Sequence, residues 1–146
     1  MSNIKFEAKG QSVNKTKLRA KVRNFVVEVD EPKDLGGGDE APNPVEYILV
    51  GLAGCINVVA NHIAGELGIT INNLEITTSG NININKFLGT SDKERAGFQG
   101  INLELSYQSD APQALLDKWH EEVSKRCPVK DNLLDETPIQ ISVKAA

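Results

Sequence analysis

The two cysteines, Cys55 and Cys127, are the residues best suited to chemistry, because a thiolate is both a nucleophile and a redox group. Cys55 lies within an apolar run from Tyr47 to Ile56, and Cys127 directly follows the cationic pair Lys125-Arg126. Oxidation of one thiol by a peroxide gives a sulfenic acid, which a second thiol converts into a disulfide. If the fold brings the two residues together, they form a reactive thiol with a resolving partner.

A reactive thiol also requires a positive charge nearby. A free cysteine has a pKa near ~8.5, so a cation is needed to raise the thiolate fraction at neutral pH. Arginine suits this role because it stays charged and donates hydrogen bonds from a planar fork. The arginines of this chain are Arg19, Arg23, Arg95 and Arg126. Arg23 stands where the alternation of apolar residues changes phase, which favours a re-aimed side chain; a solvated position on an edge strand is the alternative.

A metal site is the competing interpretation of the cysteines. No Cys-x-x-Cys motif is present, so zinc ligands would have to come from Cys55, Cys127, His62 and His120 across the fold, without a spacing signature. We therefore expect neither a metal nor a cofactor. His62 follows Cys55 by about 10 Å along a helix, too far to act as its general base, and is expected in the core or at an interface. His120 is expected at the surface.

The element that must position Cys55 is a predicted helix over Pro44–Gly68. Its run from Tyr47 to Ile56 is apolar on all sides, which predicts a helix that is buried all round. The run is shorter than the ~20 apolar residues that span a bilayer. Gly51 and Gly54 in its interior predict that another backbone comes close.

A long glycine-rich loop leads into this helix. It contains Gly36-Gly37-Gly38 and Pro42-Asn43-Pro44, in which Asn43 is a suitable N-cap residue. Loops of this length are uncommon unless they have a function, so this loop is a candidate lid.

Alternation of apolar and polar residues predicts the strands. They are expected over residues 4–8, 18–22, 25–29, 74–84 with a bulge at Gly80, 101–107 and 139–143. A second helix is expected after its cap Asp110, with an inward stripe at Leu116, Trp119, Val123 and Cys127. The order βββ-α-ββ-α-β indicates an α+β fold with antiparallel sheet, and residues 1–146 are expected to form a single domain.

The charge balance excludes some classes of partner. A formal net charge of −4 argues against nucleic acid, whose binding needs a clustered basic face. The first residues carry Lys5, Glu7 and Lys9 without an apolar run, so we expect neither a signal peptide nor a membrane anchor, and a cytoplasmic location. A purely structural disulfide is not expected in that reducing compartment.

Several motifs together resemble the OsmC/Ohr family, the osmotically inducible and organic hydroperoxide resistance proteins. They are Asp30-Glu31-Pro32, Gly36-Gly37, the segment Pro42 to Glu46, the segment Gly51 to Cys55, and Cys127-Pro128-Val129. The predicted order of elements also agrees with this family. The resemblance extends over nearly the whole chain.

The resemblance implies antiparallel sheets wrapped around a central buried helix and an intertwined homodimer with active sites at the subunit interface. It also implies a cysteine-based peroxidase of oxidative-stress defence that reduces organic hydroperoxides and is recycled by a dithiol. Carried over by motif, Cys55 is the peroxidatic nucleophile and Cys127 the resolving thiol. Arg23 is the counterpart of the activating arginine, or Arg19 if the alignment shifts.

One position departs from the pattern. Where the family's hydroperoxidase branches have a glutamate after the loop proline, this chain has Val45, and the acid is Glu46. On a continuous helix Glu46 lies on the face opposite Cys55, roughly 13 Å away. Glu46 can then orient Arg23 only if the helix starts late or the partner chain supplies the arginine. The Pro-Val-Glu form resembles the less characterised OsmC-like branches.

Two further hypotheses remain beside the peroxidase. The chain is then either a non-catalytic protein that binds a lipid-like or carbonyl ligand in an apolar cleft, or a dimeric redox sensor whose two thiols only switch state.

Overall fold

The computed structural model describes residues 3–145 and confirms the α+β class with antiparallel sheets. The chain divides between Leu49 and Val50 into two compact units. Helix α1, Pro44–Leu67, begins in the first unit and continues through the second.

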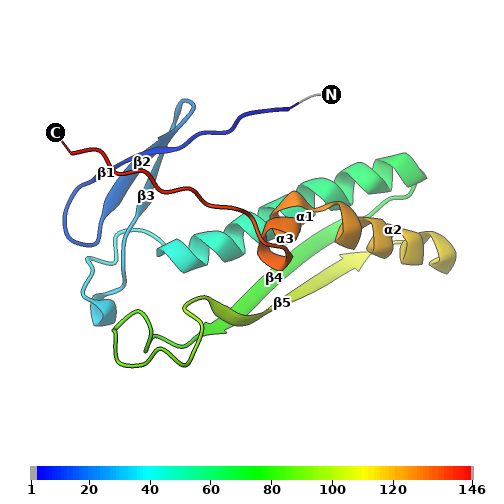
Figure 1. Ribbon diagram of the computed structural model, residues 1–146. Helices are drawn as coiled ribbons and strands as arrows, with labels where there is room; N and C mark the ends of the chain where they lie inside the picture. The colour runs from blue at the N-terminus through cyan, green and yellow to red at the C-terminus, as the bar shows by residue number, and fades with distance from the viewer. Residues whose placement is uncertain (1–2, 146) are drawn as a thin grey trace. The chain divides into compact units, whose positions relative to one another are not determined.

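The N-terminal unit contains one three-stranded sheet (Figure 1). Its antiparallel strands are β1 (Lys9–Ser12), β2 (Leu18–Val22) and β3 (Phe25–Val29), in that order. The predictions for β2 and β3 are confirmed, but the strand predicted over residues 4–8 is wrong. Lys9 already pairs with Lys21, next to the end of β2, so residues before Lys9 have no strand to pair with. Ile4 and Phe6 are accordingly 73% and 86% exposed.

A turn joins β2 and β3 at the point where the alternation of apolar residues changes phase. Val22 pairs with Phe25, which leaves Arg23 and Asn24 as the connecting residues. Arg23 has a φ of 55°, in the left-handed region, and its guanidinium carbon lies 5.1 Å from the centre of the Phe25 ring.

The glycine-rich loop after β3 is organised by Asp30, whose side chain is 1% exposed. The Asp30 carboxylate accepts hydrogen bonds from the Thr16 hydroxyl and from the backbone N–H groups of Glu31, Gly38 and Glu40. Its own N–H donates to the Pro42 carbonyl at 3.3 Å. The loop, which includes the short 3-10 helix η1 (Lys33–Leu35), is thus fastened to the end of β3.

Gly37 is required by this loop. A Cβ atom at Gly37 would lie 1.8 Å from the carbonyl oxygen of Glu31, so no other residue fits without backbone movement. The loop therefore depends on both a buried carboxylate and a glycine.

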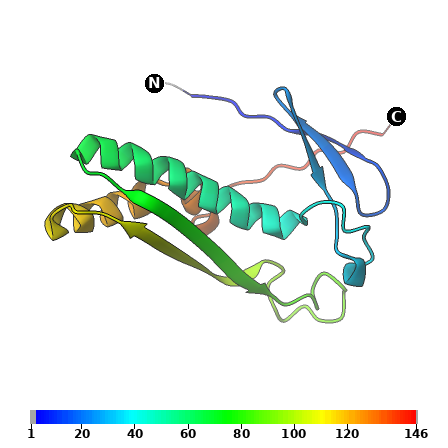
Figure 2. The same ribbon diagram turned by 180° about the vertical axis from the view of Figure 1, so that it is seen from behind.

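The C-terminal unit contains a two-stranded sheet, β4 (Asn72–Ile82) and β5 (Phe98–Gln108), with helices α2 (Gln113–Arg126) and α3 (Pro128–Leu134) (Figure 2). The long strand is confirmed, including a register shift between Gly80 and Ile82. The predicted cap at Asp110 is wrong, because the Pro112 carbonyl accepts the first helical N–H groups of α2.

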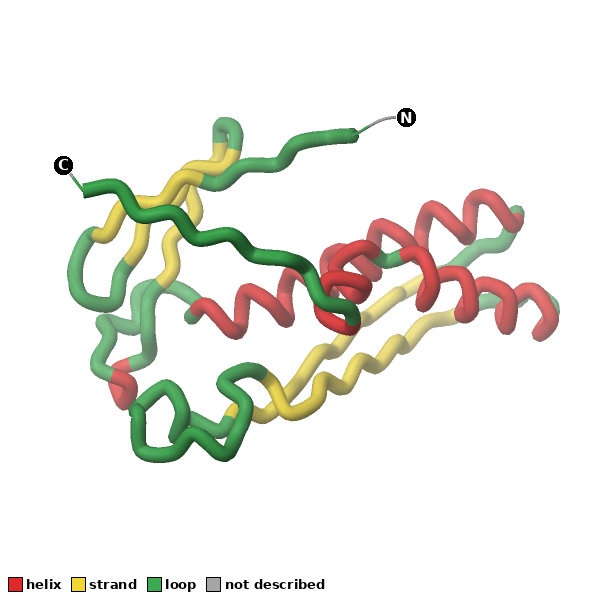
Figure 3. Tube along the Cα trace, in the orientation of Figure 1, coloured by secondary structure: helices red, strands yellow, loops and turns green. Residues whose placement is uncertain are grey.

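The last part of the chain differs from the prediction. Residues 139–143 form no strand, and Ile139, Ile141 and Val143 are 83%, 87% and 92% exposed. Figure 3 shows this segment as loop after α3, a helix that the sequence did not predict. An alternating segment becomes a strand only when it hydrogen-bonds to another strand. The structure assigns no partner strand to this segment.

The core of the C-terminal unit lies between α1, α2 and the β4–β5 sheet. Its buried residues are Leu52, Ile56, Ala60, Ile63, Ala64, Trp119, Val123 and Cys127. The predicted inward stripe of α2 is confirmed. The fully buried Trp119 indole donates a hydrogen bond to the Ala60 carbonyl at 2.8 Å, which connects α2 to α1.

Helix α1 is not buried all round in this single chain, contrary to the prediction. Val50 and Val58 are 60% and 66% exposed, and among the described residues no atom beyond the adjacent residues and the neighbouring helix backbone lies within 4 Å of a Cβ built at Gly51 or Gly54. By length and composition alone α1 would also suit a membrane span, a property shared by core helices of soluble proteins. Its packing against α2 and the sheet favours a core helix.

The Asp30 contacts predict a pH-dependent contribution to stability. Burial alone would raise the pKa of Asp30, but the hydrogen bonds from Glu31, Thr16, Glu40 and Gly38 outweigh burial and hold it below its usual value. A lowered carboxyl pKa stabilises the fold above the unfolded pKa of about 4, and this contribution is lost as pH falls below it. We expect Asp30→Asn to lower the Tm by roughly 5 °C at pH 7.

Thermal unfolding monitored by circular dichroism at pH 7 and near pH 3 checks this expectation. The difference from wild type should shrink at the acidic pH, because the Asp30 carboxyl of the unfolded chain is then largely protonated and part of the stabilisation from its lowered folded-state pKa is lost. Asp34→Asn, the same change at an exposed loop residue, serves as the control and should leave the Tm unchanged. An equal Tm for Asp30→Asn and wild type at pH 7 would contradict the role assigned to Asp30.

Candidate active site

The structure brings the two cysteines together in the C-terminal unit. Cys55 lies in the middle of α1, and Cys127 lies at the junction where α2 ends and α3 begins. The Cys127 thiol donates to the Cys55 sulfur across 3.0 Å, and both residues are free thiols. Cys127 is 2% exposed, whereas Cys55 is partly exposed. Cys55 is therefore the sulfur that a molecule from solution reaches first.

The start of α3 supplies hydrogen-bond donors to both sulfurs. Cys127 is the N-cap of this helix, and its sulfur accepts from the Lys130 N–H at 3.4 Å. The Val129 N–H is directed at the Cys55 sulfur. Pro128, at the first helical position, has no N–H to place there. The Cys-Pro-Val-Lys sequence thus positions one thiol and offers a backbone N–H to each.

The surroundings nevertheless raise the pKa of Cys55. Burial is the main cause, since it disfavours the charged thiolate. The Cys127 sulfur raises it further, because two negative sulfurs this close would repel, and the Val129 N–H only partly offsets both effects. Within the described part of the C-terminal unit, no cation contributes to this pKa. The positive charge expected beside Cys55 is thus absent from the contacts of the C-terminal unit.

The expected arginines belong to the N-terminal unit. Arg23 stacks on Phe25 in the β2–β3 turn. Arg19 donates from Nε and Nη2 to Glu28 Oε1 at 2.9 and 2.8 Å. The contacts given for both arginines lie within that unit.

Glu46 has a local structural role. Its backbone N–H donates to Asn43 Oδ1 at 2.9 Å, and its Oε2 accepts from the Asn43 N–H at 2.8 Å. This reciprocal pair is a capping box, which stabilises a helix N-terminus. Because α1 begins at Pro44, the helix does not start late. Of the two ways in which Glu46 could orient Arg23, an arginine from a partner chain remains.

An ion pair beside the thiols was missed in the sequence. Arg126, the residue before Cys127, donates from Nη1 to Glu66 Oε2 at 2.6 Å and from Nη2 to Glu66 Oε1 at 3.0 Å. His62 Nε2 lies 3.0 Å from Glu66 Oε1. A separation of sixty residues gives no sequence signal for such a pair. The hydrogen bonds from Arg126, followed by His62, hold the pKa of Glu66 below its usual value.

The histidines are therefore not placed as ligands or bases for the thiols. His62 is not in the core, since its side chain is 65% exposed and paired with Glu66. His120 is exposed, as expected, with Nε2 2.8 Å from the Tyr107 hydroxyl. Within residues 3–145, no group of three or more His, Cys, Asp or Glu side chains is arranged to hold a metal ion.

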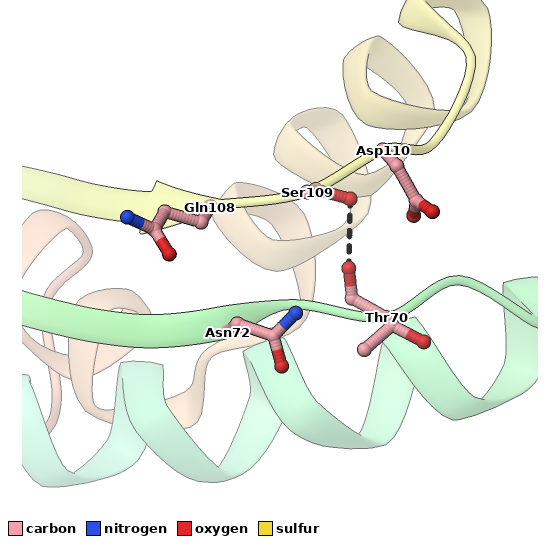
Figure 4. Close-up of a pocket in the computed structure, with 5 residues that line it drawn as sticks. All are labelled: Thr70, Asn72, Gln108, Ser109 and Asp110. Atoms are coloured by element: carbon pink, nitrogen blue, oxygen red, sulfur yellow. Dashed lines mark hydrogen bonds between the residues drawn. The ribbon is translucent and has the colours of Figure 1, made fainter.

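A separate polar pocket lies where β4 begins and β5 ends (Figure 4). Its lining residues are Thr70, Asn72, Gln108, Ser109 and Asp110. The Ser109 hydroxyl donates to the Thr70 carbonyl at 2.7 Å. Neither cysteine lines this pocket, so it does not belong to the thiol site.

Comparisons with known proteins found similar sequences and similar folds. The chain is 31% identical over 100 residues to a hydroperoxide reductase of Mycoplasma pneumoniae, which covers 68% of this chain and 67% of the relative. The crystal structure of an OsmC-like protein from Mycoplasma pneumoniae matches with a TM-score of 0.77 and 26% identity, covering 90% of this chain and 89% of that one.

A more distant structure has the same fold. An organic hydroperoxide resistance protein from Legionella pneumophila matches with a TM-score of 0.68 and 18% identity, covering 92% of each chain. The model of the OsmC-like protein family matches residues 36–144, which include both cysteines and the loop before α1. The chain therefore belongs to the OsmC-like protein family.

Proposed function

We propose that this protein is a thiol-dependent peroxidase that reduces organic hydroperoxides, with Cys55 as the nucleophile and Cys127 as the resolving thiol. The observation that carries the proposal is the 3.0 Å contact between the two sulfurs. A disulfide bond measures about 2.05 Å, so a shift of about 1 Å joins them. The partly exposed Cys55 takes the first role because a hydroperoxide can reach it, and the buried Cys127 takes the second.

The reaction proceeds in three balanced steps. The Cys55 thiolate attacks an oxygen of the hydroperoxide; the O–O bond breaks, and the alcohol leaves with a proton. Cys127 then attacks the sulfur of the Cys55 sulfenic acid, so that the disulfide forms and water leaves. A dithiol reductant returns both cysteines to thiols by exchange and is itself oxidised to a disulfide. No cofactor is required, and we place this cycle in the cytoplasm, where thiols stay reduced.

The proposal includes a homodimer, in which a second copy covers the exposed apolar residues of the C-terminal unit. On α1 these are Val50 and Val58, beside Gly51 and Gly54, which leave room for another backbone. In the tail they are Ile139, Ile141 and Val143, which keep the alternation of a strand. Exposed apolar patches of this kind mark interaction sites. A partner chain also offers a source for the arginine that Cys55 lacks.

A change at either cysteine should separate the two chemical steps. We expect one equivalent of cumene hydroperoxide to give the Cys55–Cys127 disulfide within seconds, as measured by intact mass. Cys55→Ser should abolish hydroperoxide consumption, and Cys127→Ser should accumulate a sulfenic acid that dimedone traps. Circular dichroism serves as the control that both variants remain folded. Cumene hydroperoxide consumption by Cys55→Ser at the wild-type rate would refute the assignment.

The pH profile should identify the activating arginine. The contacts of Cys55 raise its pKa, so without a cation the rate should rise about tenfold per pH unit between pH 7 and 8, as the thiolate fraction grows. We expect Arg23→Gln to show this steep profile and to be at least ~10-fold slower than wild type at pH 7. The pH profile of wild type should be much flatter, because the activating arginine lowers the pKa of Cys55 and the thiol is already ionised at pH 7.

Two control variants accompany this measurement. Lys21→Gln removes a neighbouring positive charge on β2 and should leave the profile unchanged. Arg19→Gln tests the alternative arginine. A steep pH profile in wild type itself would show that neither arginine acts on Cys55. It would also contradict the proposal that Glu46 orients such an arginine.

The dimer should depend on the tail. Light scattering after size exclusion should give twice the 15.9 kDa of one chain for wild type. Ile141→Asp should shift the protein toward monomer, because a charge would be buried at the interface. Ser142→Asp, which adds the same charge on the other face of the segment, is the matched control. A monomeric wild type at micromolar concentration would contradict the proposed assembly.

The raised pKa of Cys55 also favours a second function, a redox sensor that oxidises slowly. The same mass measurement distinguishes the two: a disulfide formed over hours, not seconds, would support the sensor. The absence of a disulfide would instead favour a protein that binds an apolar ligand without chemistry.

A further inference from the structure

The ion pair between Arg126 and Glu66 connects the two helices that also carry the thiols. Arg126 is the last residue of α2, and Cys127 follows it directly. Glu66 lies on the last turn of α1, the helix that carries Cys55. Figure 1 and Figure 2 both show α2 running alongside α1. A change in the spacing of the two helices therefore alters the ion pair and the sulfur–sulfur distance together.

The geometry of the pair limits how the end of α2 can move. Two parallel hydrogen bonds, at 2.6 and 3.0 Å, fix the orientation of the guanidinium as well as its distance from Glu66. The indole of Trp119 fastens α2 to Ala60 two turns earlier. The Trp119 contact lies two turns before the C-terminal end of α2. The ion pair holds that end, where Cys127 follows.

This pair is expected to contribute little to stability. Its side chains are 38% and 44% exposed, and ion pairs with such access to water contribute little to folding. The Arg126 guanidinium binds Glu66, and it does not contribute to the shift in the pKa of Cys55. The remaining role for the ion pair is to fix the position of Cys127.

We propose that Arg126 and Glu66 are positioning residues for disulfide formation between Cys127 and Cys55. This rests on the proposed function only for its kinetic consequence. The ion pair keeps the Cys127 sulfur within reach while Cys55 is oxidised to a sulfenic acid by a hydroperoxide. Attack by Cys127 then forms the S–S bond and releases water. Without the pair the two thiols are less well placed, and sulfenic acid formation, which does not involve Cys127, is unaffected.

The first measurement follows the two steps separately after one equivalent of cumene hydroperoxide. In Arg126→Gln and in Glu66→Gln we expect disulfide formation to slow about threefold, with the rate of sulfenic acid formation unchanged. A role through charge alone would move the two variants in opposite directions, because one removes a positive and the other a negative charge. Lys125→Gln removes the neighbouring positive charge and should behave as wild type.

The second measurement does not depend on peroxidase activity. Equilibration of the full-length protein with glutathione redox buffers gives the ratio of disulfide to dithiol. Both variants should lower the equilibrium constant of the Cys55–Cys127 disulfide about threefold, the scale that a partly exposed ion pair can supply, and Lys125→Gln should not. The exchanged pair Arg126→Glu with Glu66→Arg should restore part of this loss, because it reforms the ion pair with its polarity reversed.

The outcomes separate the two proposals. If wild type forms no sulfenic acid but the variants shift the glutathione equilibrium, the peroxidase proposal fails and the positioning role stands. If both variants match wild type in the equilibrium and in the rate of disulfide formation, the positioning role is overturned. Opposite shifts in the two variants would also overturn it, in favour of an effect of charge.

Discussion

The contact between the Cys127 and Cys55 sulfurs depends on how the elements of the C-terminal unit are arranged. Three separate pieces of chain have to agree to produce it. Helix α1 carries one thiol past the end of α2, the Trp119–Ala60 hydrogen bond sets how the two helices lie together, and the start of α3 turns the second thiol inward. A change in any of them separates two groups whose chemistry depends on being within about an ångström of bonding distance.

Much of this could be predicted from the sequence, because the relevant signals are local. The apolar run around Cys55 predicts helix α1, and the spacing of Leu116, Trp119 and Val123 predicts the buried face of α2. The alternation of apolar and polar residues predicts the inward face of β4. The same stripe extends to Cys127, which is why the second thiol could be expected on the inner face. Local periodicity indicates which face of each helix is buried, and the buried faces of α1 and α2 pack against each other.

Other features had no local signal. Residues 4–8 alternate like a strand, but β2 ends before it could pair with them. The tail around Ile141 also alternates, and no strand within residues 3–145 pairs with it. Glu46 is an exception, because its position three residues after Asn43 is a local signal for the capping box that the structure contains, and its role toward an arginine stays a prediction. The Arg126–Glu66 pair joins residues far apart in sequence, which no pattern along the chain can show.

Burial of the thiol pair has opposing effects on the two chemical steps. It raises the pKa of Cys55 and so reduces the fraction present as a nucleophile. The same packing holds Cys127 beside it, and a correctly oriented neighbour reacts as though present at a very high concentration. Rapid capture then protects the sulfenic acid from further, irreversible oxidation. An active site built this way needs its positive charge from outside the core, since a cation within it would have to lose its hydration. Within the described part of the C-terminal unit no cation acts on the pKa of Cys55, so the reactivity of this thiol depends on what the rest of the protein supplies.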